Sequence, residues 1–379
     1  MARREVLIAR SIVYAILTAN DEGKSSRKPS WWARALRFFR LYWLTFHLPP
    51  PGLFVALRRL WNIKEEDYRS SFGGGMRRDS KKGGDTLLPM GDMGYSGSTF
   101  FRTSDGAYLV KSIPRRFEHE FFRDELIFPY ADHMHANPSS LLVHITDFLE
   151  STHKSIGSLL GLAPSHHIVM ENILYGQDQE PEDGTPRLKW ESWDLKPTSY
   201  FYPERDVAGG ALASQATKSK LADEFYDKIR LSKEQAAEFK QQLEQDTMLL
   251  ADCNAVDYSL FLVRVSTTHT PEAEESRQLI QLEEDDNDPP THPAQPPFSP
   301  PSPPSWHTGI TSSDGKEVYR AAVLDFFWAK HSVHAKAMTG LVRGYNLIDE
   351  QGPMSITTES KEYRDRFLNM CTELLEVQE

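Results

Sequence analysis

The chain has 379 residues, with 43 Lys and Arg, 54 Asp and Glu, and 39% hydrophobic side chains. This length and composition suit a soluble chain with one large domain or two lobes around a cleft, and they exclude collagen-like, disulfide-stapled and wholly disordered proteins. The two cysteines, Cys253 and Cys371, exclude a disulfide framework and favour a reducing compartment. No run of about 18 uncharged apolar residues occurs, so we expect no membrane-spanning helix. The apolar stretch after Arg3 and Arg4 is short and no clear cleavage site follows, which argues against a signal peptide.

Charge is distributed unevenly along the chain. Residues 1–82 hold 17 Lys and Arg against 7 Asp and Glu, and this basic N-terminal part predicts an anionic partner. Residues 271–304 hold eight acids, one arginine and ten prolines. Such a composition cannot bury enough surface to offset its chain entropy, so we expect a disordered acidic insertion within residues 267–316.

Helices are expected at the N-terminus, over residues 4–19 and 31–48, with a further amphipathic piece at 54–63. In the second helix Arg34, Arg37 and Arg40 recur at three-residue spacing among large aromatic residues. That pattern suits a packed helix with a basic outer face, and it also suits a helix at a membrane interface with snorkelling arginines. We therefore treat residues 1–51 as a basic, aromatic N-terminal unit of helices.

The pattern then changes to short strands separated by turns and three longer helices. The first two strands meet at Asp105-Gly106, a dipeptide typical of a tight hairpin turn. Periodicity and turn residues predict strands at 100–103, 107–113, 141–148, 166–174, 188–195, 258–265 and 317–327, and helices at 117–135, 233–252 and 360–377.

A loop of small residues, Gly94-Tyr95-Ser96-Gly97-Ser98, lies directly before the first strand of this hairpin. Small side chains let backbone N–H groups approach phosphate oxygens, although such a loop also suits an ordinary turn. Lys111 lies in the returning apolar strand, where a lysine either points to solvent or reaches nucleotide phosphates. The loop and the lysine together predict a nucleotide clamp.

Acidic residues lie at the ends of three later strands. Asp194 and Lys196 close the strand 188–195, Asp257 precedes the strand 258–265, and Asp325 lies near the end of the last strand. Each acid alone suits a capping or turn role. Together they fit phosphoryl transfer from Mg-bound nucleotide, which needs a phosphate clamp, a carboxylate that orients the attacking hydroxyl and a carboxylate that holds the metal.

The order and spacing of these motifs resemble the phosphatidylinositol phosphate kinases. The resemblance covers most of residues 52–379 outside the insertion, and Asp257-Tyr258-Ser259-Leu260 is its most diagnostic segment. The His-Arg-Asp and Asp-Phe-Gly tripeptides of protein kinases are absent. The other segments that carry the resemblance are residues 94–101, 109–113, 138–142, 193–196 and 324–325.

The resemblance implies an α+β, two-lobed lipid-kinase fold, with antiparallel sheets, flanking helices and an ATP cleft between the lobes. Residues 52–187 would form the ATP-binding lobe and residues 188–379 the catalytic lobe, interrupted by the insertion. The implied reaction is ATP-dependent phosphorylation of an inositol lipid phosphate, with ATP and Mg²⁺ as cofactors. The implied partner is a phosphoinositide in an anionic membrane, reached by a cytoplasmic protein at the membrane surface, and no nucleic acid is expected.

The resemblance also implies a role for each matching residue. Asp257 would be the catalytic carboxylate and Asp325 the magnesium ligand, while Lys196 would face the transferred phosphate with Asp194 orienting it. The implied nucleotide-binding residues are Gly94, Ser96, Gly97, Ser98 and Lys111.

Two departures from the family pattern leave other functions open. Pro197 occupies a glycine position, which removes a backbone N–H, and Arg205 is displaced from the expected arginine position. After Asp325 the aromatics, lysines and histidines of residues 326–338 suit contact with an anionic bilayer, but the family's glutamate is absent. The alternatives are a non-catalytic relative that binds a phosphoinositide or a partner, and a kinase for a soluble inositol phosphate.

Overall fold

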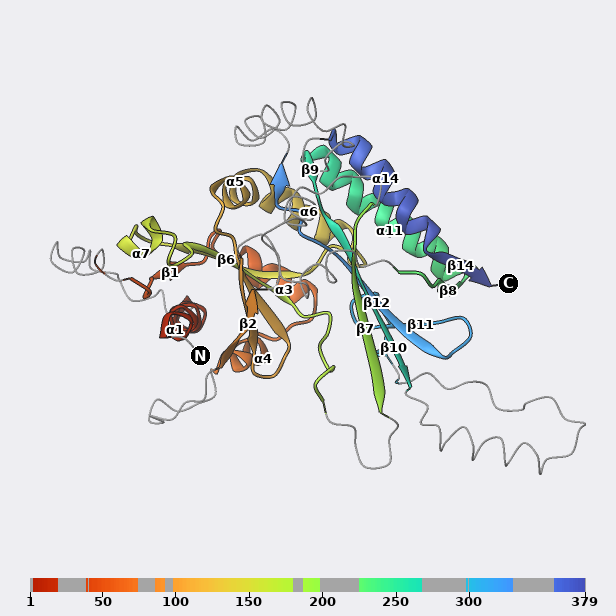
Figure 1. Cartoon of the computed structure of the whole chain (residues 1–379), viewed down its shortest axis with the longest axis horizontal. Coiled ribbons are helices and arrows are strands. Elements are labelled where there is room, and N and C mark those ends of the chain that lie inside the picture. The colour runs from red at the N-terminus through yellow and green to blue at the C-terminus, as the bar shows by residue number, and fades with distance from the viewer. Residues whose placement is uncertain are drawn as a thin grey trace, which may run out of the picture.

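A computed structural model of the chain describes residues 3–19, 39, 41–73, 86–92, 98–179, 187–197, 225–267, 298, 300–329 and 358–378. The fold is α+β, with helices around antiparallel sheets, as predicted. Figure 1 shows the N-terminal half of the chain, red to yellow, beside the C-terminal half, green to blue. None of the helices within these residues is long and apolar enough to cross a membrane.

The N-terminal lobe is built on a six-stranded sheet in the order β1-β5-β6-β4-β3-β2. The predicted hairpin is confirmed as β3 and β4, and Gly106 between them has a φ of 77°, a conformation that favours glycine. The strands of the sheet are β1 (Phe46–His47), β2 (Leu87–Asp92), β3 (Thr99–Thr103), β4 (Tyr108–Ser112), β5 (Ile145–Ser151) and β6 (His166–Glu171).

Helices and one π-helical turn cover this sheet, and the predicted helix 117–135 is found as three consecutive pieces. The first helix, α1, buries Ile8, Ile12 and Ile16, which lie on one face at four-residue spacing, in a cluster with Val110 and Leu149 of the sheet. The helical elements of this lobe are α1 (Arg3–Thr18), α3 (Leu53–Leu60), α4 (Glu65–Ser71), α5 (Arg116–Phe121), η2 (Phe122–Leu126), α6 (Ile127–Ala136) and α7 (Ile156–Leu159).

The described elements within residues 1–51, α1 and β1, pack on or pair with this sheet, so the predicted boundary at residue 51 does not separate them from the lobe. The helix expected at 31–48 is also wrong over its last part, because residues 41–45 are not helical and Phe46–His47 form β1. Pairing with β5 decides the outcome there, since Phe46 lies opposite Ser151 in an antiparallel ladder. Residues 31–38 and 40 lie outside the described part of the chain.

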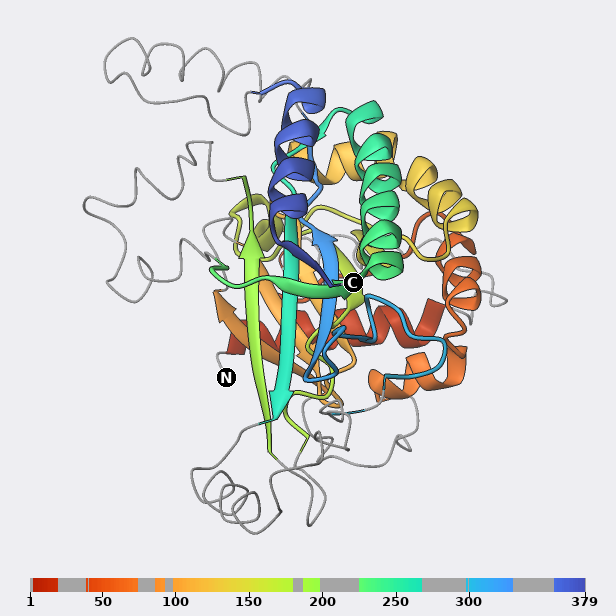
Figure 2. The same cartoon turned by 90° about the vertical axis from the view of Figure 1, so that its right-hand side faces the viewer.

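The C-terminal lobe is a four-stranded sheet in the order β11-β12-β10-β7 with α11 and α14 packed together over it (Figures 1 and 2). The helix α11 begins at a capping box made by Ser232 and Gln235, and its bounds match the predicted 233–252. The elements of this lobe are β7 (Leu188–Leu195), β8 (Ile229–Ser232), α11 (Lys233–Asp252), β9 (Ala255–Val256), β10 (Ser259–Thr267), β11 (Ile310–Thr311), β12 (Glu317–Leu324), β13 (Trp328–Ala329), α14 (Ser360–Glu373) and β14 (Leu375–Gln378).

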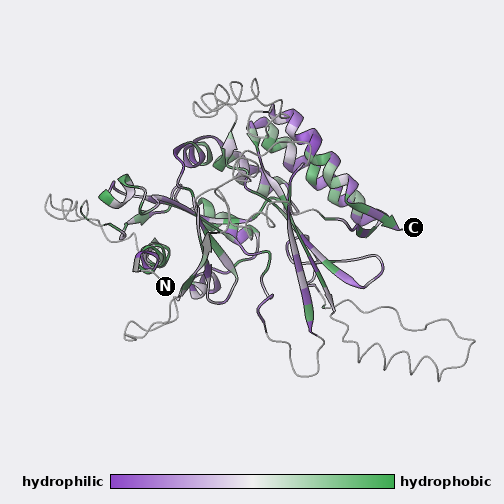
Figure 3. Cartoon of the chain, in the orientation of Figure 1, coloured by the Kyte–Doolittle hydropathy of each residue, from purple (hydrophilic) through white to green (hydrophobic). Residues whose placement is uncertain are grey.

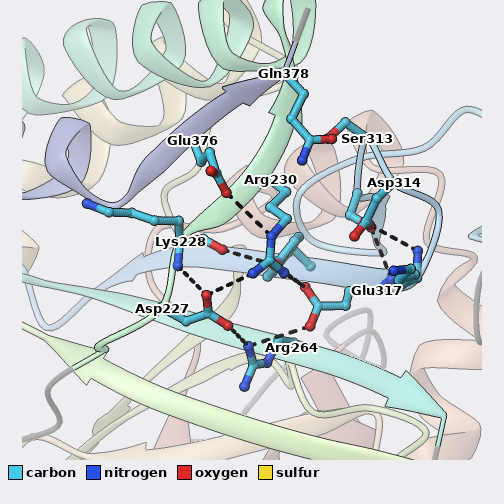
Figure 4. A network of polar contacts seen from close by, with 12 residues as sticks. Asp227, Lys228, Arg230, Arg264, Ser313, Asp314, Glu317, Glu376 and Gln378 are labelled. Atoms are coloured by element: carbon cyan, nitrogen blue, oxygen red, sulfur yellow. Dashed lines mark hydrogen bonds and ion pairs between the residues drawn. The ribbon is translucent and has the colours of Figure 1, made fainter.

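A network of charged residues joins the parallel pair β8 and β14 to this sheet (Figure 4). The Arg264 guanidinium lies 2.9 Å from Glu191 and 2.5 Å from Asp227, and Arg230 lies 3.1 Å from Asp227 and 3.4 Å from Glu376. Because each arginine meets carboxylates from more than one element, the network fixes the C-terminal end of the chain against the sheet.

Both ends of the disordered insertion predicted at 267–316 are ordered, so the prediction is wrong for Thr267 and for residues 300–316. Thr267 belongs to β10, and residues 300–316 form a turn and β11, with Trp306 only 3% exposed. The Trp306 ring packs against Phe239 of α11 with the centroids 4.4 Å apart, so apolar burial orders this part of the segment despite its prolines. Residues 268–297 and 299 lie outside the described part of the chain.

Candidate active site

Two acidic residues lie where the strand pairing of the C-terminal lobe changes. The long strands β10 and β12 pair up to Ser259 opposite Leu324, and the short strands β9 and β13 then pair with Val256 opposite Trp328. Asp257 and Asp325 occupy this break, and both have left-handed backbones, with φ of 66° and 62°. Non-glycine residues in this conformation are uncommon and cluster at functional sites. The break in pairing thus presents both predicted carboxylates at one end of the sheet.

A lysine reaches each of these acids. Lys111 of β4, in the N-terminal lobe, pairs with the carboxylate of Asp325 in the C-terminal lobe. Lys196 directly follows β7, which lies beside β10, and its Nζ is 3.3 Å from Oδ1 of Asp257. The structure therefore brings together four of the predicted site residues, Lys111, Lys196, Asp257 and Asp325, although they lie up to 214 positions apart in the sequence.

The Lys111–Asp325 pair is held by a mostly apolar surround but is open on one side. The Lys111 side chain is 9% exposed and lies over the rings of Phe100 and Phe327, whereas the Asp325 side chain is 45% exposed. Burial raises the pKa of the Asp325 carboxyl, but the charges of Lys111 and Lys196 lower it by more, so this pKa lies below its ordinary value. Asp325 is thus a carboxylate at neutral pH and is accessible to a ligand.

Glu118 of α5 lies near enough to Lys111 for their charges to interact, and it was not among the predicted site residues. Its carboxyl lies 3.4 Å from the Arg115 guanidinium and is only 14% exposed. Burial raises its pKa to about 7, and the charges of Arg115 and Lys111 offset part of that effect. The available signal was an acid in the first turn of the helix that directly follows the Lys111 strand.

The loop predicted to cover phosphates is described only at its end. Ser98 is buried, and the neighbouring Thr99 donates its backbone N–H to the Ser112 hydroxyl at 2.8 Å. Phe100 lies directly opposite Lys111 in the ladder of β3 and β4, so this end of the loop lies beside the lysine. Gly94, Ser96 and Gly97 lie outside the described residues, and their phosphate-binding role stays a prediction.

Pro197, which departs from the family pattern, directly follows Lys196 at the end of β7. Asp194 is exposed and Pro197 is buried, while the Lys196 side chain is 24% exposed. The lysine pairs with Asp257, which the sequence reasoning did not anticipate. The role of Asp194 in orienting Lys196 stays a prediction.

The aromatic residues directly after Asp325 are buried, so they do not supply the predicted membrane contact of this loop, which stays a prediction for residues 330–338. Phe326, Phe327 and Trp328 are 0%, 5% and 8% exposed. Phe327 packs edge-on against Phe122, and Trp328 packs against Phe117 of α5. These rings anchor the start of the segment because an apolar core is available to them. Lys330 and Lys336 lie outside the described residues.

A second set of titratable residues joins the two lobes, and we call His144, Glu171 and His307 the histidine clasp. Glu171 accepts from both rings, through Oε2 from His144 Nδ1 at 3.1 Å and through Oε1 from His307 Nδ1. The His307 Nε2 lies 2.9 Å from the carbonyl oxygen of Ser140. Among the described residues, these three form the one group of His, Cys, Asp and Glu side chains whose ligand atoms lie close enough together to hold a metal ion.

The geometry of the histidine clasp argues against a shared metal ion. The two imidazole rings are stacked with centroids 4.2 Å apart and planes 7° from parallel. The in-plane N–H bonds of the two Nδ1 atoms point side by side at different oxygens of Glu171, so neither Nδ1 offers a lone pair to a metal ion. Burial lowers the pKa of His144, whereas in His307 the effect of burial is outweighed by the Glu171 charge, which raises that pKa. The cluster is an ion pair of His307 and Glu171 with a neutral His144 beside it.

The connection between the lobes is fixed by Arg320 of β12. Its Nη1 donates to the carbonyl oxygens of Ile173 at 3.0 Å and Tyr175 at 2.7 Å, and its Nε donates to Thr308 at 3.0 Å. The segment that leaves β6 is therefore tied to the centre of the C-terminal sheet, and the lobes meet in a defined position around the Lys111–Asp325 pair.

Comparison with known proteins agrees with this geometry. Residues 81–374 match the family model of phosphatidylinositol-4-phosphate 5-kinase. A probable phosphatidylinositol phosphate kinase of Dictyostelium discoideum is 26% identical over 230 residues, which is 61% of this chain and 29% of that protein. A phosphatidylinositol 4-phosphate 5-kinase of Plasmodium falciparum (isolate 3D7) is 31% identical over 97 residues, 25% of this chain and 6% of that protein. The chain thus matches less than a third of either relative's length.

Proposed function

Because the chain belongs to the phosphatidylinositol-4-phosphate 5-kinase family, we propose that it transfers the terminal phosphoryl group of ATP to a ring hydroxyl of an inositol lipid phosphate. The observation that carries the proposal is the meeting of Lys111 with Asp325 and of Lys196 with Asp257 at one break in the C-terminal sheet. Phosphoryl transfer needs charge neutralisation and positioning more than covalent chemistry from the protein, and these four charged groups can supply both.

Each of the four residues has a distinct role in this proposal. Lys111 binds nucleotide phosphates, and its present partner Asp325 then becomes free to hold a cation. Asp257 accepts the proton of the attacking hydroxyl, and Lys196, 3.3 Å away, holds that carboxylate and faces the transferred phosphate. Asp194 completes the set by orienting Lys196.

Magnesium fits the residues present. Mg²⁺ prefers oxygen ligands and binds kinases through one or two carboxylates together with substrate phosphates. Asp325 offers such a carboxylate, since it is ionised and 45% exposed. When bound, the ion would neutralise charge on the nucleotide phosphates.

Membrane contact is the second part of the proposal, because the substrate is a lipid. Residues 24–40 hold six Lys and Arg and no Asp or Glu, so they are suited to an anionic surface. Replacing Arg34, Arg37 and Arg40 with glutamate should weaken binding to anionic vesicles. The protein would then act at the cytoplasmic surface of a membrane.

The test is a radiolabelled ATP assay in which separate phosphoinositide isomers are presented in vesicles. Incorporation of label into one isomer, with dependence on magnesium, is the expected result. Label in a soluble inositol phosphate without vesicles would replace the lipid with a soluble substrate. Binding of nucleotide and lipid without any turnover would remove the catalytic proposal.

A second candidate function, a phosphoinositide-binding relative with impaired catalysis, is favoured by Pro197. Proline removes a backbone N–H directly after Lys196, at a position where the family has glycine. If this loss limits catalysis, Pro197→Gly should raise turnover at unchanged lipid affinity. Equal turnover in both proteins would remove the argument from Pro197.

A further inference from the structure

A third basic side chain, that of Arg115, lies at the candidate active site and has no role in the reaction proposed above. Arg115 follows Lys111 by four positions and directly precedes α5. Its side chain is 29% exposed. The next residue, Arg116, has a side chain that is 79% exposed and pairs along the helix with Glu120 at 2.7 Å. Arg116 therefore lies on the open surface of α5, whereas Arg115 is held against the protein.

Arg115 is held over Trp328. The central carbon of its guanidinium lies 5.8 Å from the centre of the Trp328 ring, within the range of a cation–π contact. Trp328 pairs with Val256 in the ladder of β13 and β9, and Asp257 directly follows Val256. Arg115 thus lies over the same short ladder that borders Asp257 and Asp325.

The start of α5 is fixed on this ladder. Phe117 packs edge-on against Trp328, with the ring centroids 4.5 Å apart and the planes 72° from parallel. The rest of α5 is mostly polar, and its ribbon has mainly the colours of hydrophilic residues in Figure 3. Because Phe117 anchors the backbone two positions away, Arg115 needs little reordering to meet a ligand at the site.

The positive charge of Arg115 is only partly neutralised by its partner. Nη1 of Arg115 lies 3.4 Å from Oε1 of Glu118, which is longer than a strong charge-assisted hydrogen bond. Burial raises the pKa of Glu118 to about 7, so this carboxyl is near half protonation at neutral pH. Lys111, in contrast, pairs with Asp325, whose pKa lies below its ordinary value. Arg115 therefore keeps more of its charge available to a further anion than Lys111 does.

The charge of Arg115 also reaches the groups of the candidate active site. Burial raises the pKa of Asp325, and the charges of Lys111, Lys196 and Arg115 lower it. A guanidinium also differs from the two lysines in shape, because its planar fork presents two parallel N–H bonds to two oxygens of one phosphate group. The site thus contains two point charges and one group that suits bidentate contact with phosphate.

We propose that Arg115 binds a phosphate group of a ligand at the candidate active site, through two N–H bonds of its guanidinium. The inference rests on the proposed phosphoryl transfer and deepens it by adding a binding residue. That reaction brings two kinds of phosphate to the site, those of the nucleotide and the one that the inositol lipid already carries. Both offer the same oxygen acceptors, so the experiment has to separate them.

The test uses the full chain with Arg115→Gln and Arg115→Lys. Arg116→Gln is the matched control, since it removes the same charge at the neighbouring position from an exposed side chain. Three probes are titrated by calorimetry: a non-hydrolysable ATP analogue with magnesium, monomeric short-chain phosphatidylinositol 4-phosphate, and short-chain phosphatidylinositol, which carries no phosphate on its ring hydroxyls.

The expected result is that Arg115→Gln raises the Kd of a phosphate-bearing probe at least about tenfold, because a bidentate charge-assisted contact is lost. Arg115→Lys should bind that probe about threefold or more weakly than the parent, because it keeps the charge without the fork. Arg116→Gln should bind as the parent does. A loss confined to phosphatidylinositol 4-phosphate assigns Arg115 to the lipid phosphate, and a loss confined to the ATP analogue assigns it to the nucleotide.

Other outcomes overturn the proposal. Parental affinity of Arg115→Gln for all three probes removes Arg115 from ligand binding, and a lower melting temperature beside it makes Arg115 a structural contact of Trp328. An equal loss in Arg115→Gln and Arg116→Gln is an effect of net charge. Parental affinity of Arg115→Lys shows that a point charge suffices and contradicts the bidentate contact. If Arg115→Gln is unfolded at the assay temperature, Arg115→Lys carries the test, because it retains a charge beside Glu118.

The failure of this proposal is distinguishable from the failure of the proposed function. The titrations measure binding without turnover. A parent that phosphorylates a phosphoinositide while Arg115→Gln keeps parental affinities leaves the function standing and removes Arg115. A parent that binds the probes without any turnover, and loses affinity in Arg115→Gln, removes the function and retains Arg115 as a phosphate-binding residue.

Discussion

Two of the places where the lobes meet through charged groups, the candidate active site and the histidine clasp, differ in a way that separates the chemistry expected of the first from the structural role of the second. At the candidate active site, Lys111 pairs with Asp325 and Lys196 with Asp257, and both acids have left-handed backbones. In the histidine clasp the polar atoms other than the buried His144 Nε2 bond one another and Ser140, with little contact with solvent.

Accessibility is what distinguishes the two. Asp325 is 45% exposed, so a ligand can replace one member of its pair, whereas the Glu171 side chain is 19% exposed and already accepts from two rings. A charged pair that solvent and ligands can reach contributes little to stability and is available for chemistry. A buried pair is costly to break because a charge is left without a partner. Substitutions at the candidate active site should therefore change activity, and substitutions in the histidine clasp should change stability.

The largest effect is expected for Lys111→Met. Turnover should fall about thousandfold, since one preorganised charge at the transferred phosphate is lost, while the melting temperature changes little because Asp325 can be hydrated. Steady-state kinetics and thermal melting measure both quantities. Lys189→Met is the matched control, because Lys189 is a 57% exposed lysine on β7. Near-parental turnover of Lys111→Met would show that the lysine does not bind phosphates.

Substitutions of Asp257 and Asp325 should differ in how nucleotide binding depends on magnesium. Asp257→Asn and Asp325→Asn should each lower turnover about hundredfold. Only Asp325→Asn should greatly weaken nucleotide binding in the presence of magnesium, because only a metal ligand changes the occupancy of the ion. Calorimetric titration of nucleotide with and without magnesium checks this. If nucleotide binding by Asp325→Asn depended on magnesium as it does in the parent, Asp325 would not be the magnesium ligand.

In the clasp, Glu171→Gln should lower the free energy of unfolding by about 3 kcal/mol at neutral pH, because the buried positive charge of His307 loses its carboxylate. Chemical denaturation measures this effect. Turnover per folded molecule should stay within a few-fold of the parent. A stable Glu171→Gln protein without activity would place the clasp in the catalytic machinery.

The stability lost in Glu171→Gln should depend on pH. Burial raises the pKa of Glu171, but the neighbouring imidazoles lower it by more, so the folded-state pKa lies below the ordinary value of 4.5. A carboxyl group with a depressed pKa stabilises the fold at pH values above its unfolded-state pKa. This contribution is lost as the pH falls through the folded-state pKa. The stability difference between the parent and Glu171→Gln should be full at neutral pH and should narrow below about pH 4.5. A difference that widens on acidification would contradict the assignment of charge.

Glu118 should give a smaller effect, visible in the pH profile. Its folded-state pKa is raised to about 7, so its contribution to stability is full below the unfolded-state value of 4.5 and is lost as the pH rises through about 7. Above that pH the ionised carboxylate adds a second negative charge near Lys111. Turnover should therefore rise severalfold between about pH 6 and 8 in the parent and be flat in Glu118→Gln. The same inflection in both proteins would assign it to another group.

Deletion of residues 271–297 should have the smallest effect, with turnover unchanged and less than about 1 kcal/mol lost, since shortening a long loop changes closure entropy only slightly. The matched comparison extends the deletion through residue 309. That longer deletion removes Trp306 and His307, so it should destabilise the protein by several kcal/mol, about the cost of losing a buried tryptophan and a buried ion pair. Equal melting temperatures for the two deletions would contradict the packing of residues 300–309.

Local sequence determined several elements of the fold and several candidate site residues. The Asp-Gly turn and alternating strands fixed the β3–β4 hairpin, and the capping residues and apolar periodicity fixed α11, because these features depend on neighbours a few positions away. Lys111 was identifiable in advance as a lysine within an apolar strand, and Lys196, Asp257 and Asp325 as charged residues at the ends of apolar strands.

Only the tertiary structure decided which of these groups face one another. Lys196 belongs with Asp257, and Glu118 lies near Lys111, because strand register and helix placement bring together residues that are far apart or unremarkable in the sequence. Residues 41–47 follow β5 and not their helical pattern, and Trp306 orders a proline-rich segment. In each case the free energy of packing against a distant element exceeds the local preference, and a local preference cannot report a partner that lies elsewhere in the chain.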